Sequence, residues 1–368
     1  MIGINRLIYT LILFYPLLYG IPGIQDGLGH FFEVVYFSML FPLILMNTAL
    51  NINNIKLSVT WLVLLGVFFS WMIGVNEISN ARPYFYLLGL IFISLYVSQD
   101  TLHIGDIKKI SAIYIVFFIV LSVVFFMFDS AYIDDGERYK GFAMSPTHYS
   151  VYALCASVIV YNSFLQKKNI IICFFAFSLL IFFSETRLSL LVFILITSIF
   201  LLSEHIKKHL KLYFVMLFLF FSLSYPIYGV IYQYTKVVSL RYEGDADKSF
   251  DSRLLIQQVI FDEFSQAEEK DLLLGHGAEA ARNRLIQFYG EDVMPHNDYI
   301  RIIYDYGLLG FSLFIILLYF LSTKNIYTLS FSAIYLSSFY HNMAFSLYVI
   351  AMIIISGKIF ECNNKGGV

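Results

Sequence analysis

Apolar runs long enough to cross a bilayer recur along the whole 368-residue chain. A membrane-spanning helix needs roughly 20 mostly apolar residues, because the hydrocarbon core of a bilayer is about 30 Å thick. The composition agrees, since 59% of the residues are hydrophobic and 14% are charged. An average soluble domain carries roughly a quarter charged residues. The sequence therefore predicts an all-α, polytopic membrane protein.

About twelve such apolar segments follow one another along the chain. They lie near 7–24, 31–50, 57–75, 84–98, 110–128, 147–164, 169–184, 188–203, 211–230, 298–321, 326–340 and 343–360. We expect the first segment to be a retained span, because no small-residue cleavage site follows it.

The expected domain organisation has three parts. Nine transmembrane helices occupy 1–230, a large periplasmic loop occupies 231–297, and three more helices with a cytoplasmic tail occupy 298–368. The three cysteines predict no disulfide framework, since Cys155 and Cys173 fall in apolar runs and Cys362 lies in the C-terminal tail.

Basic residues are sorted between the two sides of this topology. With the N-terminus in the cytoplasm, twelve fall on the inner side and four in the short outer loops, which follows the positive-inside rule. The inner residues are Arg6, Lys56, Lys108, Lys109, Lys167, Lys168, Lys207, Lys208, Lys211, Lys324, Lys358 and Lys365. The outer residues are Arg82, Arg138, Lys140 and Arg187.

The outer side is rich in arginine. Eight of the nine arginines and most of the acidic residues lie there, whereas the inner basic residues are nearly all lysines. The planar guanidinium group suits bidentate contacts to anions. This asymmetry predicts an outward-facing site for an anion.

The large loop is expected to be folded. The stretch "DSRLLIQQVIFDEFSQAEE" (251–269) has apolar residues at helical spacing and predicts an amphipathic helix. The stretch that follows it, "LLLGHGAEAARNRLIQFYG", predicts a glycine turn and a second short helix. A loop of this length in a compact protein is usually functional.

Three outer segments carry polar residues that suit chemistry. The first is "ERYKGFAMSPTHYS" (137–150), at the start of a span, and the second is the turn "SETRLS" (184–189). The third is the large loop together with "PHNDYIRIIYDYGLLG" (295–310), which leads into the next span.

The order of these segments resembles the O-antigen ligase and polymerase superfamily. In that family a G-F-x-x-x-P stretch, a Ser/Thr-x-Arg turn, an Arg-bearing loop helix ending in G-x-G and an H-N-x-x-(L/I) segment ending in G-L-x-G occur in this order. The resemblance covers roughly 138–320. The chain departs from the pattern at the turn, where Glu185 and Thr186 precede Arg187 and the family often has Ser-Arg.

The resemblance implies a glycan transferase with a C-type glycosyltransferase-like membrane fold, whose active site faces the periplasm from the bacterial inner membrane. The donor and the acceptor would be oligosaccharides linked to undecaprenyl diphosphate. No metal and no other cofactor is expected. The implied partners are these lipid-linked glycans, the lipid bilayer, a chain-length regulator and a flippase, and no nucleic acid.

The residue types fit this chemistry. Arginines neutralise charge that develops on a diphosphate leaving group, and a base raises the reactivity of a sugar hydroxyl by roughly 10²–10⁴-fold. Our hypothesis is that His296 is the catalytic base and that Arg187 and Arg253 bind the diphosphate. Further candidates are Arg241 and Arg301 for the anion, and Asn297 and Asp298 as supporting residues.

Each of these residues also has a purely structural interpretation. His296 can be a polar cap of the span that follows it, Arg187 a snorkelling arginine, and Arg253 part of a solvated helix face. Arg301 and Asp305 are four residues apart on one helical face and can pair with each other. His148 lies on a possible acceptor path or is structural.

The leading functional interpretation is a polymerase of lipid-linked polysaccharide repeat units, acting by inverting, metal-independent transfer. The close alternative is a ligase that moves the finished glycan to lipid A–core, which differs from the polymerase in its acceptor. The short chain and modest loop favour the polymerase. Two other classes remain open: a polysaccharide flippase or other transporter, and a non-catalytic scaffold of an envelope assembly complex.

Overall fold

The computed structural model describes residues 2–19, 104–133, 138–143, 145–163, 167–238, 245–277, 279–291, 293, 297–337 and 347–359. The long or apolar helices are α1 (Ile2–Tyr19), α5 (Ile104–Phe125), α6 (Pro146–Ser163), α7 (Lys167–Phe183), α8 (Arg187–Leu201), α10 (Leu210–Val238), α14 (Asp298–Ser322), α15 (Ile326–Leu336) and α16 (Leu347–Ile359). The remaining elements are η4 (Asp129–Ala131), β1 (Tyr132–Ile133), β2 (Arg138–Tyr139), α9 (Ser203–Ile206), α11 (Asp245–Ser265), α12 (Glu269–Leu274) and α13 (Ala280–Tyr289).

The chain is mostly helical, as the sequence predicts. Nine of the predicted apolar segments fall wholly or mostly on described residues, and a helix covers most of the described part of each. The predicted segments near 31–50, 57–75 and 84–98 lie outside the described residues. Among the described helices, two are long and apolar enough to cross a membrane by length and composition, Gly105–Phe125 and Asp298–Ser322.

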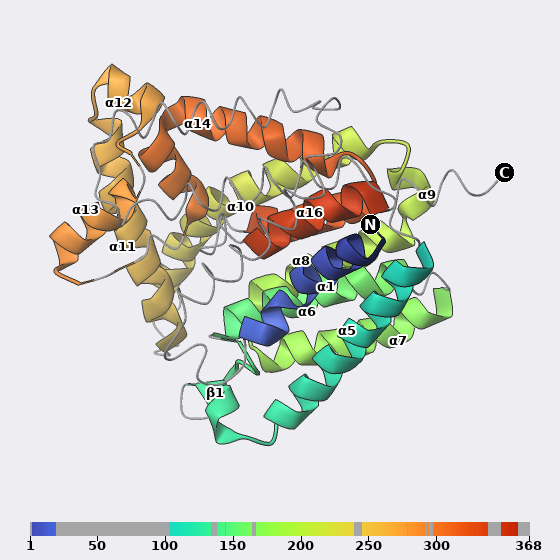
Figure 1. Cartoon of the computed structure of the whole chain (residues 1–368). Helices are drawn as coiled ribbons and strands as arrows, with labels where there is room; N and C mark the ends of the chain where they lie inside the picture. Colours follow the sequence, from blue (N-terminus) through green and yellow to red (C-terminus); the bar gives the residue numbers. More distant parts are fainter. Residues whose placement is uncertain are drawn as a thin grey trace.

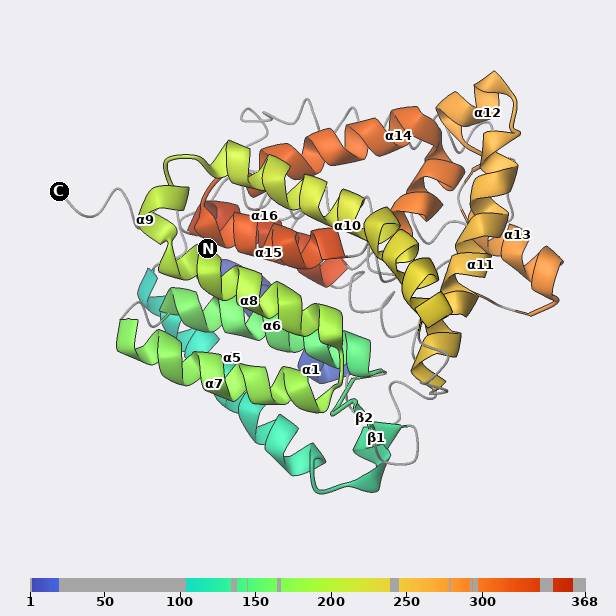
Figure 2. The same ribbon diagram turned by 180° about the vertical axis from the view of Figure 1, so that it is seen from behind.

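The apolar helices run side by side and leave two distinct ends (Figures 1 and 2). One end carries α11, α12 and α13, and we call it the loop end. The opposite end carries α9 and the starts of α5, α7 and α10, which hold several of the lysines predicted to face the cytoplasm. The described lysines that were predicted to face the cytoplasm at these helix starts thus lie at the end opposite the loop end.

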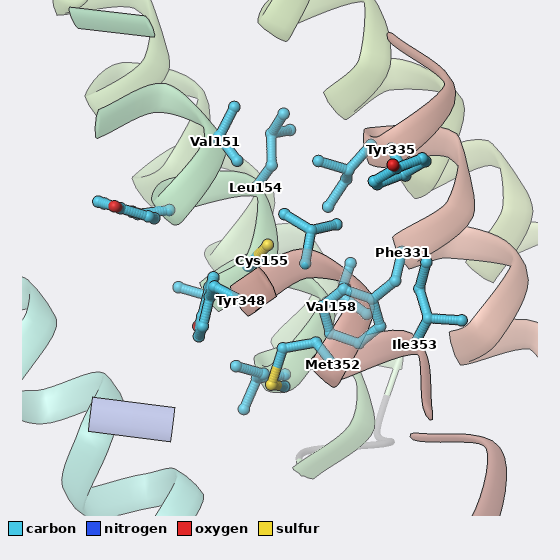
Figure 3. Packing of buried hydrophobic residues seen from close by; sticks show 14 of the residues in the cluster. Val151, Leu154, Cys155, Val158, Phe331, Tyr335, Tyr348, Met352 and Ile353 are labelled. Atoms are coloured by element: carbon cyan, nitrogen blue, oxygen red, sulfur yellow. The ribbon is translucent and has the colours of Figure 1, made fainter. Parts of the chain in front are cut away.

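Helix α6 lies at the centre of the bundle. Every residue from 149 to 161 is buried, which fits a helix that is apolar on all sides. Figure 3 shows α6 packed against α15 and α16. The labelled side chains are Val151, Leu154, Cys155 and Val158 of α6, Phe331 and Tyr335 of α15, and Tyr348, Met352 and Ile353 of α16.

Side-chain hydrogen bonds join neighbouring helices inside this bundle. Ser150 and Ser189 lie 2.7 Å apart between α6 and α8, and Tyr161 and Thr197 lie 2.9 Å apart further along the same pair. Such bonds between apolar helices contribute about 0.6–2 kcal/mol each. They fix the register of α8 on α6, and therefore the position at which α8 begins.

The α15 N-terminus offers a test of this packing. Asn325 caps α15 through hydrogen bonds from the backbone N–H groups of Tyr327 and Thr328, and its amide donates to the carbonyl of Ser356 on α16 at 2.9 Å. We expect Asn325→Ala to lower the unfolding free energy by about 1–2 kcal/mol, since an N-cap is lost. Thermal unfolding of the detergent-solubilised protein measures this. The control is Asn283→Ala at an exposed position of α13, and equal melting temperatures for both variants would contradict the prediction.

Candidate functional site at the loop end

The three polar segments singled out from the sequence meet at the loop end. Helices α6, α8 and α14 all begin there, and α11 to α13 lie beyond their starts (Figures 1 and 2). The turn "SETRLS" joins the end of α7 at Phe183 to the start of α8 at Arg187. The starts of three helices and the folded loop therefore lie at the same end of the bundle.

The loop helices are attached to α14 by a small apolar core of their own. It consists of Ile256 and Ile260 of α11, Ala281 and Leu285 of α13, and Tyr304 of α14. The predicted amphipathic helix is α11, although it begins earlier than predicted, at Asp245, and ends at Ser265. Since its apolar face packs on α13 and α14, the loop is held against the membrane helix.

The backbone of α14 changes direction at Gly307, where φ is 66° and ψ is −177°. This break removes the helical donors of the preceding turn, and the carbonyls of Tyr304 and Asp305 accept from other donors. They bond the backbone N–H groups of His276 at 3.0 Å and Gly277 at 2.9 Å. The turn after α12 therefore completes the hydrogen bonding of the broken helix.

Two glycines allow the backbones to come this close. A Cβ on Gly307 would lie 2.3 Å from the carbonyl oxygen of Leu273, and a Cβ on Gly275 would lie 2.4 Å from the carbonyl oxygen of Asp305. Both glycines also have positive φ, a conformation that costs other residues energy. We call this contact the glycine crossing. His276, between the glycines of "GHG", stacks on Tyr304 with ring centroids 4.3 Å apart.

Asp305 holds the start of α13. Its carboxylate is fully buried and accepts from the backbone N–H groups of Glu279 at 3.2 Å and Ala281 at 2.8 Å. Unpaired N–H groups at a helix N-terminus favour an anionic partner. In α13 a carboxylate from α14 makes these bonds, because the N-cap residue itself, Glu279, makes no side-chain cap bond.

Arg301 forms ion pairs with both Asp305 and the N-cap residue of α13. Its guanidinium group bonds Glu279, and its Nε lies 3.6 Å from the carboxylate of Asp305. All three side chains are buried, and we call them the ion-pair cluster. Glu279 has a left-handed backbone conformation with φ of 61°, which costs a non-glycine residue about 1–3 kcal/mol. The cluster offsets that cost and satisfies the pairing predicted between Arg301 and Asp305.

Asn297 fixes the entry to α14. Its side-chain oxygen accepts from the backbone N–H groups of Tyr299 at 3.1 Å and Ile300 at 3.2 Å, so it is the N-cap of the helix. It is buried, as is Asp298, whose charge acts on Arg301. His296 immediately precedes this cap in the sequence and lies outside the described residues.

The predicted arginine ligands fall on different elements. Arg187 is the first residue of α8 and is exposed at the loop end. Arg253 lies in α11, on a stretch whose backbone alone is described, and Arg241 lies outside the described residues. The structure thus exposes one predicted arginine, Arg187, at the loop end and buries another, Arg301, in ion pairs.

The segment before α6 lines the same end. Tyr139 of β2 is buried, which raises the pKa of its phenol, so it stays neutral and donates to the backbone carbonyl of Ser122. The Oγ of Ser145 lies 2.7 Å from Nδ1 of His148 and accepts from the backbone N–H of the same histidine. His148 is exposed and belongs to the first turn of α6, which agrees with its structural interpretation.

Glu279 is the residue of this site that sequence reasoning misses. Nothing in "GHGAEAAR" distinguishes it from the exposed acids around it, because its role depends on a partner 22 residues away. The glycines of "GHG" predict a turn, but the contact between Gly275 and Gly307 cannot be predicted from the sequence. The positive φ of Glu279 and the lack of a side-chain cap bond from this residue to α13 are visible only in the folded backbone.

We expect Gly307→Ala to disrupt the glycine crossing. A backbone with φ of 66° and ψ of −177° is essentially restricted to glycine and costs another residue about 1–3 kcal/mol, and the new methyl group would overlap the carbonyl of Leu273. The matched control is Gly105→Ala in α5, where no heavy atom lies within 4 Å of the added carbon. Thermal unfolding of the two purified variants is the measurement, and a Gly307→Ala protein as stable as the control would refute the crossing.

The ion-pair cluster predicts a difference between two arginines. Arg301→Met leaves two buried carboxylates without their cation and should cost about 3–5 kcal/mol. Arg284→Met breaks the partly exposed pair with Glu263 and should cost about 0–1 kcal/mol. Amide hydrogen exchange in α13 is expected to rise in the first variant and to stay near wild type in the second. Similar exchange in both would show that the cluster does not hold α13.

Comparison with known proteins relates one part of the chain to a protein family. No curated protein matches the chain. Residues 172–315 match a family model described as O-antigen ligase, a family whose members are membrane glycosyltransferase-like polymerases and ligases. The matched region contains the Arg187 turn, α11 to α13, the glycine crossing and the ion-pair cluster. This match over residues 172–315 supports the resemblance to the O-antigen polymerase and ligase superfamily.

Proposed function

We propose that the protein is a polymerase of lipid-linked polysaccharide repeat units, for O-antigen or capsule. It transfers the growing glycan from undecaprenyl diphosphate to the non-reducing end of a new lipid-linked repeat. The family match supports a membrane glycosyltransferase, and the arrangement of the loop end supports the location of its site.

The observation that carries the proposal is the fixed start of α14. Asn297 caps the helix, and the glycine crossing and the ion-pair cluster bind its first turns to the loop. His296 is the next residue before this cap. Catalysis by positioning favours a base that is next to a fixed stretch of backbone in the sequence.

In the proposed reaction His296 accepts the proton of the acceptor hydroxyl. The acceptor oxygen forms a bond to the anomeric carbon of the donor while the bond from that carbon to the diphosphate oxygen breaks. Attack from the face opposite the leaving group inverts the configuration. A histidine suits the proton transfer because its ordinary pKa lies near neutral pH.

Arginines neutralise the diphosphate that leaves. Arg187 begins α8 at the loop end. Its positive charge and the partial positive charge of the helix N-terminus both attract an anion such as the diphosphate. Arg253 of α11 is the second ligand that we propose, and Arg241 follows it. Arg301 ranks last for direct anion contact, because it would first have to leave the ion-pair cluster.

The remaining setting follows from the same proposal. The chain has about twelve spans in a C-type glycosyltransferase-like arrangement, with residues 231–297 as a periplasmic loop. Its active site faces the periplasm from the inner membrane. Its partners are the two lipid-linked substrates, a chain-length regulator and a flippase, and it needs no metal or other cofactor.

A ligase of the same superfamily is the second candidate, because the matching family model carries that description. The two enzymes share the donor and differ in the acceptor, which is lipid A–core for a ligase. A flippase or a scaffold is less favoured, since neither needs a capped helix start beside a loop that carries arginines.

A complementation experiment tests the function and the base together. Cells that lack the gene receive the wild type, His296→Ala or His209→Ala at equal expression, and surface polysaccharide is resolved on a gel. His209 is exposed at the end of the bundle opposite the loop. We expect His296→Ala to lose the ladder, since loss of a general base costs roughly 10²–10⁴-fold in rate, and His209→Ala to restore it.

The pattern of the loss identifies the enzyme. A single repeat left on lipid A–core means a polymerase. Loss of all glycan from the core, with long chains left on the lipid carrier, means a ligase and overturns the leading proposal. A normal ladder from His296→Ala removes this histidine as the base.

A further inference from the structure

The junction between α12 and α14 exposes a group of leucines. Leu308 and Leu309, which directly follow the break in α14, are 49% and 41% exposed, and Leu273 near the end of α12 is 52% exposed. Exposed leucines are common one at a time, but a contiguous group indicates an interaction surface. We call these three residues the leucine junction.

The glycine crossing makes this group contiguous. The carbonyl of Leu273 lies against Gly307, the residue immediately before Leu308, so the two leucines are neighbours although they come from different elements. Both views show α12 beside the bend of α14, along the same outer edge of the molecule (Figures 1 and 2).

The leucine junction continues an apolar stripe of α14. Leu309, Ile316 and Phe320 are spaced by seven and four residues, which places them on one helical face, and all three are exposed. In a helix that crosses a bilayer, an exposed apolar stripe faces the acyl chains. Leu273 therefore lies where that lipid-facing surface reaches the loop end.

The residue order in α12 fits the same boundary. Its first residues, Glu269 and Lys270, are exposed and charged, whereas its last turn is Leu272–Leu274 in sequence. A segment that passes from charged to apolar over one or two turns suits the region between lipid headgroups and acyl chains.

We propose that α12 is an interfacial membrane anchor, with Leu273 inserted into the acyl-chain boundary of the outer leaflet beside Leu308. The bilayer is the occupant because the surface is continuous with the lipid-facing stripe of α14. The anchor sets the height of the loop above the membrane. This inference rests on α14 crossing the bilayer and does not depend on the proposed reaction.

Lipid quenching of single tryptophans tests the proposal in the full-length protein. Trp61 and Trp71 are replaced by phenylalanine, and Leu273→Trp, Leu308→Trp or Phe261→Trp is added. Phe261 is 60% exposed on α11 and serves as the matched control away from the leucine junction. The variants are reconstituted into vesicles whose phosphatidylcholine is brominated near the headgroup end of the acyl chain.

We expect the tryptophans introduced at positions 273 and 308 to be quenched to a similar extent, and the one at 261 to be quenched by aqueous acrylamide instead. Bromine quenching at 273 no stronger than at 261 overturns the proposal. Protection at 273 from both quenchers also overturns it, because a protein partner would then cover the surface. Absence of lipid quenching at position 308 also overturns the proposal, because α14 would then not face the acyl chains there.

A second label guards against misfolding of the tryptophan variant. A nitroxide is attached through Leu273→Cys in a protein whose three native cysteines are replaced by alanine. Collisions with oxygen, which concentrates in lipid, should exceed those with a water-soluble nickel chelate. The opposite ratio contradicts the anchor, and the same label at Phe261→Cys supplies the aqueous reference.

Discussion

The glycine crossing is the contact on which the loop end depends. At Gly307 the helix gives up its regular hydrogen bonds, and the turn containing Gly275 supplies replacements from another segment. The exchange is possible because neither residue has a side chain, so two backbones approach to a distance that any Cβ would prevent. Without it, a break at Gly307 would leave the carbonyls of Tyr304 and Asp305 without donors, and α12 would have no place to dock.

Charge then makes this contact specific. Burying Glu279, Arg301 and Asp305 together is expensive, and such groups are retained where their geometry is well satisfied. Here Asp305 takes two backbone N–H donors of α13, and Arg301 balances both acids. The same three side chains thus link α13 to α14 directly and α12 indirectly. A loop attached in this way moves with the membrane helix, and the arginine of α11 moves with it.

The sequence alone predicted the helical class and, among the described residues, a helix at nine of the twelve apolar segments, although several ends differ by five to eight residues. These predictions follow from local periodicity, which needs no tertiary information. It also offered pairing of Arg301 with Asp305, because a spacing of four is a local property. It did not reveal Glu279 or the meeting of Gly275 with Gly307, since these depend on segments brought together by folding. The roles of His296 and the arginines remain predictions for mutagenesis.

The residues of the ion-pair cluster are synthesised one after another, so the cluster forms only when the last of them has been made. Glu279 leaves the ribosome 22 residues before Arg301. At roughly 5–20 residues per second, its cation follows about 1–4 s later. Until then the carboxylate stays hydrated, and the apolar faces of α11 and α13 have no α14 to pack on. Closure of the loop is therefore a late event of biogenesis, and a pause in translation between these codons would prolong the period in which chaperones and proteases reach it.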